Sequence, residues 1–432
     1  MRKIAEYIAV LKNKEFSLLW ISQIASELAY QMVTFSTAVI IYQETGNTLY
    51  VSLIVILVSV APILFSTIAG FVADGYDRRK VMIMSHSLRL LLGVGMLFFF
   101  PFPLILLPIT FLLASIAQFF EPAQASSIPA LLPENQLFIG NSFFSFTRYA
   151  MFLVGYTIAG PLLVGVGPFA IFLIIIGLYI VCLISAWRVR PLREHLPLDA
   201  GQSVREFKKS IAAIPKKLKE GFVFMMQDRV VAFLMFQVSF IFAVERGFIS
   251  LAPAFALDWL AIDVSDISLY LILPTGLGTL AGTVTTNVLK HRMSRNMMVT
   301  GGTLLDGFAL VSLAVFAYGR GSFFPDTFSA TIVAIVILAF LSGFADPFII
   351  VPAQTVVQER TPKEKRGRIF GNLVLMMNLL GLIPIATIGV LSRFVPIVSI
   401  VAGLGVLIVI VGFIGVLYWR KFRLEPELQA GV

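Results

Sequence analysis

Long apolar runs dominate the sequence, and each is long enough to cross the roughly 30 Å hydrocarbon core of a bilayer as a helix. Apolar residues make up 58% of the 432 residues and charged residues only 13%, which leaves too little polar surface for a soluble protein of this size. The sequence therefore predicts an all-α integral membrane protein with twelve transmembrane helices. They are expected near residues 16–42, 49–73, 80–101, 103–125, 140–165, 167–187, 229–256, 266–288, 296–318, 327–351, 367–391 and 394–418.

Lysine and arginine gather in alternate loops between these runs, while the loops on the opposite side hold only Arg320 and Arg393. Loops rich in these residues stay in the cytoplasm. Both termini are therefore expected in the cytoplasm of a multi-pass protein of the cell membrane. The net charge of +9 is explained by this topology and by contact with anionic lipid, not by binding to nucleic acid.

The longest polar stretch separates six runs from six. Apolar residues recur within it every three or four positions from Val204 to Phe222, which predicts an amphipathic helix on the inner leaflet. We expect an N-terminal six-helix bundle at 1–187, a cytoplasmic amphipathic linker at 188–228 and a C-terminal six-helix bundle at 229–432. A repeat supports two related halves, because Glu121-Pro122 and Asp346-Pro347 are followed by similar proline and glycine patterns.

The loop after the second run carries a small residue, an acid and a basic cluster where a helix leaves the membrane, at Gly70, Ala73, Asp74, Arg78 and Arg79. This pattern resembles the loop between helices 2 and 3 of the major facilitator superfamily. Gly75 departs from it, since the family pattern has a basic residue there. The resemblance implies a transporter with two pseudo-symmetric six-helix bundles that work by alternating access.

Further segments resemble the macrolide-efflux and enterobactin-exporter branch, which exchanges drugs for protons. They are Ser26 to Tyr30, Ser85 to Arg89, Thr45 to Asn47, and Arg366 to Gly371. Tyr30 and His86 stand where that group often has acids, so its acidic pattern does not carry over.

Eight ionisable residues fall inside the predicted runs: Glu27, Arg89, Glu121, Arg148, Glu245, Arg246, Asp306 and Asp346. A charge at the bilayer centre costs roughly 2.5 to 3.5 kcal/mol on insertion scales, so each residue needs a partner, water or a function. A rise of about 1.5 Å per residue places Glu27, Arg89, Arg148 and Asp306 near the midplane. Glu245 and Arg246 are expected nearer the outer side, and Glu121 and Asp346 in the inner third.

The resemblance implies a cytoplasmic gate made of charge-assisted hydrogen bonds. Its first part is expected to comprise Gly70, Asp74, Arg78, Arg79 and Glu121. Its C-terminal counterpart pairs Asp346 with Arg292 or Arg295. The alternative is that these residues only end helices at the lipid surface.

Substrate binding and proton coupling are assigned to a second set: Glu27, His86, Arg89, Arg148, Glu245 and Asp306. Glu27 and Asp306 are the candidates for binding a proton when substrate leaves. Arg89 and Arg148 pair with these acids or bind an anionic group of the substrate, and His86 either titrates or forms a helix contact. The alternative is ion pairing that serves helix packing alone.

We therefore predict a proton-coupled exporter of amphipathic or hydrophobic small molecules, such as a drug, a macrolide or a siderophore-like compound, acting as a monomer. Its partners are the substrate, protons and anionic lipid. A lysophospholipid or glycolipid flippase and a non-transporting sensor or scaffold are the alternatives. No enzymatic activity, cofactor or metal is expected, because the sequence has one cysteine, Cys182, three histidines and no phosphate-binding glycine loop outside the runs.

Overall fold

The chain is helical apart from short turns in the residues that the structure, a computed structural model, describes. These are residues 2–192, 223, 227–260, 262, 267–289, 292–319, 323, 328–360, 381–382 and 384–421. The chain divides into two compact units, Met1–Leu218 and Lys219–Val432. Most of the predicted amphipathic linker, including the whole stretch from Val204 to Phe222, lies outside the described residues.

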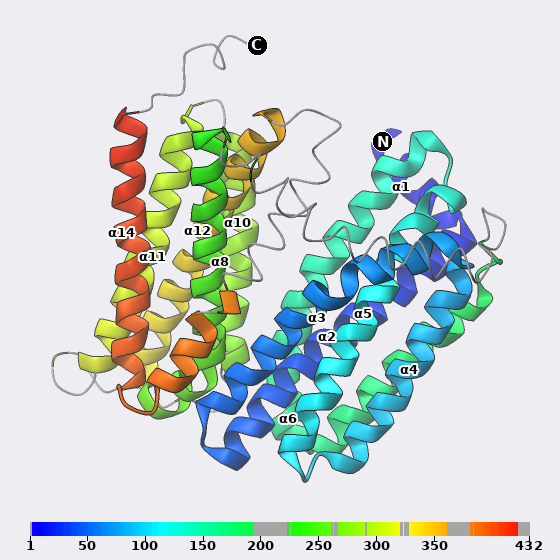
Figure 1. Cartoon of the computed structure of the whole chain (residues 1–432), viewed down its shortest axis with the longest axis horizontal. Helices are drawn as coiled ribbons and strands as arrows, with labels where there is room; N and C mark the ends of the chain where they lie inside the picture. The colour runs from blue at the N-terminus through cyan, green and yellow to red at the C-terminus, as the bar shows by residue number, and fades with distance from the viewer. Residues whose placement is uncertain are drawn as a thin grey trace. The chain divides into compact units, whose positions relative to one another are not determined.

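The described residues of the first unit form six helices and one short 3-10 helix. They are α1 (Arg2–Lys12), α2 (Lys14–Thr45), α3 (Thr48–Gly75), α4 (Arg78–Phe99), α5 (Pro103–Leu131), η1 (Glu134–Gln136) and α6 (Leu137–Arg188). Helix α2 packs along α6, α3 packs along α5, and α4 packs against both α5 and α6 (Figure 1). Asn13, Asn47 and Asp77 cap α2, α3 and α4 by accepting backbone N–H bonds, which sets where each helix begins.

Helix α6 is two helices joined at a backbone break. Gly167 has φ +81° and ψ 168°, in the left-handed half of the map that favours glycine, and Pro168 follows it. The break divides α6 into the two runs that the sequence predicts at 140–165 and 167–187.

The second unit contains α8 (Arg229–Phe255), η2 (Ala256–Leu260), η3 (Ile267–Ile272), α10 (Leu273–Leu289), α11 (Arg295–Gly319), α12 (Phe328–Arg360) and α14 (Ile397–Lys421). Helix α11 packs against α12 and α14, and α10 packs along α12. Most of the predicted run 367–391 lies outside the described residues.

Ten helices of the described part are long and apolar enough to cross a membrane, and one of them is the broken α6. Large apolar side chains such as Leu64, Val284 and Leu417 are exposed along these helices, as expected where lipid is the solvent. The all-α, multi-pass membrane fold is thereby confirmed. Twelve spans and cytoplasmic termini stay predictions.

Candidate functional site

A carboxyl cluster lies inside the second unit. Glu245 on α8, Asp306 on α11 and Asp346 on α12 each place a carboxylate oxygen within 4.8 Å of the other two. Ser342 Oγ on α12 donates to Asp306 Oδ1 at 2.5 Å. Asp306 is only 2% exposed. Carboxylates this close can share a proton or another small cation.

Charge in this cluster is unbalanced. Among the residues that the structure describes, Arg246 is the cationic neighbour that acts on Glu245, and its guanidinium lies over the Phe242 ring of the same helix, 4.7 Å from the centroid. One guanidinium against three carboxyl groups leaves negative charge in excess. In a medium of low dielectric, that excess favours binding of a positive ion.

The structure corrects the predicted place of Asp346. Arg295, one of its two predicted partners, forms an ion pair with Glu359, and the other, Arg292, is exposed in the turn before α11. The predicted run ended at residue 351, whereas α12 continues to Arg360. The additional helical turns after residue 351 put Asp346 near the middle of α12, with a carboxylate oxygen within 4.8 Å of one of Asp306. Glu245, expected nearer the outer side, lies in the same cluster.

A mixed-charge cluster lies inside the first unit. Arg148 Nε on α6 lies 3.8 Å from Glu27 Oε1 on α2, and Arg148 Nη1 lies 3.7 Å from Glu121 Oε2 on α5. The three side chains are exposed to different degrees, at 53% for Arg148, 43% for Glu121 and 15% for Glu27. Glu121 lies nearer the middle of its helix than predicted, because α5 ends at Leu131 and not at residue 125.

Two more predicted site residues, both on α4, form hydrogen bonds to side chains of α2. Arg89 Nη1 donates to Ser26 Oγ at 2.5 Å, and its guanidinium lies 5.1 Å from the centre of the Phe120 ring. His86 Nε2 and Ser22 Oγ share a hydrogen bond of 3.0 Å. Both side chains are buried, so His86 is a hydrogen-bonded helix contact here.

The predicted cytoplasmic gate is only partly defined. Arg78 Nη1 donates to the Ser126 carbonyl of α5 at 2.8 Å, and Arg79 donates to the Trp187 carbonyl at the end of α6. The Asp74 side chain lies outside the described part, and Gly70 lies in α3 where an added Cβ meets nothing within 4 Å. The ion pair of Glu121 with Arg148 differs from the predicted one, and the latch with Asp74 stays a prediction.

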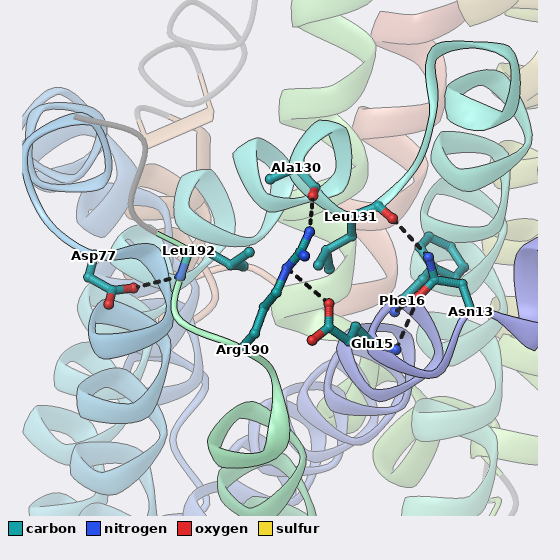
Figure 2. A network of polar contacts seen from close by, with 8 residues as sticks. All are labelled: Asn13, Glu15, Phe16, Asp77, Ala130, Leu131, Arg190 and Leu192. Atoms are coloured by element: carbon teal, nitrogen blue, oxygen red, sulfur yellow. Dashed lines mark hydrogen bonds and ion pairs between the residues drawn. The ribbon is translucent and has the colours of Figure 1, made fainter.

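A second polar network at these helix ends was not found from the sequence (Figure 2). Arg190, just after α6, forms an ion pair with Glu15 at 3.1 Å and donates to the Ala130 carbonyl at 2.8 Å. Asn13 Nδ2 donates to the Leu131 carbonyl at 2.8 Å. Asp77 accepts the backbone N–H of Leu192 at 3.2 Å. An Asn or Asp directly before an apolar run is a recognisable cap, whereas the partners far along the chain carry no local signal.

Comparison with known families identifies the fold. The Major Facilitator Superfamily model matches residues 19–324, which is most of the chain. The chain belongs to the major facilitator superfamily. Within it, the "Uncharacterized MFS-type transporter YkuC" of Bacillus subtilis (strain 168) is 25% identical over 377 residues, covering 78% of this chain and 83% of that protein. The "Putative bacilysin exporter BacE" of the same organism is 24% identical over 361 residues, covering 83% of this chain and 82% of that protein.

Solved transporter structures share the architecture at low identity. A POT family transporter crystallised with a thioalcohol conjugated peptide superposes with a TM-score of 0.75 at 13% identity, covering 94% of this chain and 96% of that one. A bacterial homologue of the iron transporter ferroportin, in its inward-facing state, superposes with a TM-score of 0.70 at 14% identity, covering 93% and 98%. At such low sequence identity, these structures are evidence for the fold alone.

Proposed function

We propose that this chain is a proton-coupled exporter of amphipathic or hydrophobic small molecules, acting as a monomer by alternating access. Family membership supports transport, and the name of one relative, a bacilysin exporter, supports the outward direction. The observation that carries proton coupling is the carboxyl cluster of Glu245, Asp306 and Asp346 inside the second unit. The proton gradient supplies the energy, and the proposal needs no cofactor.

The closeness of the three carboxyl groups supports a bound proton. Two ionised carboxylates have only acceptor atoms and repel each other, whereas a proton on one of them lets it donate to the other. Asp306 adds a third carboxyl group within 4.8 Å, and repulsion among ionised groups favours keeping that proton. When water reaches the cluster, the ionised forms are solvated and the proton can leave. Alternate opening to the two sides would then carry protons inward while substrate moves outward.

Uptake of a fluorescent amphipathic compound into inverted membrane vesicles tests this proposal. We expect uptake that depends on the proton gradient in the wild type and falls about tenfold or more in Glu245→Gln, Asp306→Asn and Asp346→Asn, because each removes an ionisable carboxyl group. Glu134→Gln is the matched control, since Glu134 is an exposed acid in η1.

Two results would contradict parts of the proposal. Uptake that survives a protonophore would exclude proton coupling. Gradient-driven uptake at the wild-type rate in all three variants would show that the proton is carried elsewhere in the chain.

A further inference from the structure

We infer that the cluster of Glu27, Glu121 and Arg148 is a recognition site for the cationic group of an aromatic organic cation, and that Arg148 occupies the place of that group when substrate is absent. This inference rests on the proposed function and narrows its substrate class. It is carried by the geometry of the ion pairs, by their exposure, and by the aromatic side chains that continue the same helix faces.

Arg148 is held loosely by both acids. Its contacts with Glu27 and Glu121 are 3.8 and 3.7 Å long, whereas a charge-assisted hydrogen bond between a guanidinium and a carboxylate is about 2.7 to 2.9 Å. The guanidinium is therefore attracted to two carboxylates without a bidentate bond to either. In the pair with Glu121 both side chains are about half exposed, and such exposed ion pairs contribute little, so a competing cation can displace Arg148 from Glu121 at small cost.

The cluster of Glu27, Glu121 and Arg148 has more negative than positive charge. Glu121 and Arg148 are about half exposed, and Glu27 adds a second carboxylate behind them. The next cation, Arg89, acts on Glu27 but is buried, bonded to Ser26 and placed against the Phe120 ring. A ligand that reaches the cluster thus meets two carboxylates and one movable guanidinium. That arrangement favours a cationic ligand over an anionic one.

Aromatic side chains extend the site along α6 and α2. Phe152 and Tyr156 follow Arg148 by four and eight residues, so they lie on the same side of α6. Phe35 follows Glu27 by eight residues on α2, and its ring lies 5.6 Å from that of Tyr156. Phe152 is 41% exposed, and its ring lies 4.8 Å from that of Tyr156.

The exposed strip from Arg148 to Phe152 is therefore both charged and aromatic. A guanidinium that is half exposed in the middle of a span is unfavourable against lipid tails, so this strip faces water rather than lipid. Carboxylates beside an accessible aromatic face are the groups that bind a lipophilic cation, through charge and through cation–π contact. The site thus selects an aromatic cation over a neutral or anionic molecule of the same shape.

Tetraphenylphosphonium and tetraphenylborate provide the test, because they have nearly the same shape and opposite charge. Equilibrium dialysis would measure their binding to the full-length protein in nanodiscs, after subtraction of binding to empty nanodiscs. We expect the phosphonium to bind at least about tenfold more tightly than the borate. Glu121→Gln should weaken phosphonium binding about tenfold, and Arg148→Gln should strengthen it several-fold, because the competing cation is gone.

Glu134→Gln is the control acid outside the site, and Glu121→Asp should restore most of the affinity. If Glu121→Gln does not fold, two other measurements test the inference. They are the phosphonium affinity of Arg148→Gln relative to wild type, and the preference of the wild type for phosphonium over borate. Equal binding of the two probes, or no gain in Arg148→Gln, would overturn the inference.

Failure of the inference is distinguishable from failure of the proposed function. Selective phosphonium binding without gradient-driven transport in vesicles would support the recognition site and contradict the proposed exporter function. Gradient-driven transport of other compounds, with no preference between phosphonium and borate in binding, would support the exporter function and contradict the recognition site.

Discussion

One carboxylate oxygen of Asp77 accepts two backbone hydrogen bonds. Its Oδ1 accepts the backbone N–H of Arg79 at 3.0 Å, which caps α4, and the backbone N–H of Leu192 at 3.2 Å, which fixes the segment after α6. Both bonds end on N–H groups that would otherwise lack a helical or strand partner. This acid, three residues after Asp74, therefore connects the loop after α3 to the segment after α6.

Replacement of Asp77 should destabilise the protein by more than an ordinary surface substitution. We expect Asp77→Ala to lower the free energy of unfolding by about 1 to 3 kcal/mol, because a helix cap and a second charge-assisted bond are lost together. Asp77→Asn keeps an acceptor oxygen and should lose less. Thermal unfolding of the purified protein in detergent measures both, with Glu134→Ala as control. Equal stability of Asp77→Ala and the control would refute this role.

Among single residues, the sequence predicted which charges lie in the membrane but not which of them meet. The cost of burying a charge singled out Glu245, Asp306 and Asp346 without any structure. Their depth was estimated from predicted helix ends, and an error of nine residues at the end of α12 moved Asp346 to the wrong level. Contacts between α8, α11 and α12 depend on helix packing, which has no local pattern in the sequence.

Among the helices, α10 and α12 approach most closely through glycine. A Cβ added to Gly343 would lie 1.9 Å from the Thr275 carbonyl oxygen, and one added to Gly278 would lie 2.1 Å from the Phe340 carbonyl oxygen. Small residues permit such backbone contact where no water is available to drive packing. Gly278 and its neighbour Gly282 were identified from the sequence as packing glycines, whereas Gly343 became evident only from its facing helix.

A methyl group at this crossing should force the two helices apart. We expect Gly343→Ala to lower the free energy of unfolding by about 1 to 3 kcal/mol through overpacking. Gly301→Ala is the matched control, since Gly301 also lies in a helix but an added Cβ meets nothing within 4 Å. Thermal unfolding in detergent compares them, and a Gly343→Ala protein as stable as the Gly301→Ala protein would contradict the packing role.

For the whole molecule, the positive-inside rule assigns each loop to one side of the membrane. Exposed residues are available on both predicted sides in each unit. Lys80 in the first unit and Arg292 in the second are expected inside, whereas Glu44 and Arg393 are expected outside. The one native cysteine, Cys182, is buried and can be replaced by serine to give a clean background.

Cysteine labelling on that background tests the topology. A maleimide that cannot cross membranes should label Glu44→Cys and Arg393→Cys in intact cells. It should label Lys80→Cys and Arg292→Cys only after the cells are permeabilised. Labelling of either inner position in intact cells would overturn the predicted orientation of its unit.

The ion pair between Arg190 and Glu15 connects the first and last long helices of the first unit. Glu15 lies at the start of α2 and Arg190 just beyond the end of α6, so the run of helices from α2 to α6 begins and ends at one place (Figure 2). A half whose ends meet can be joined to a second copy by a connector that never crosses the bilayer. Duplication of a half-length gene would then need no rearrangement of either copy, in agreement with the repeated Glu-Pro and Asp-Pro segments about 225 residues apart.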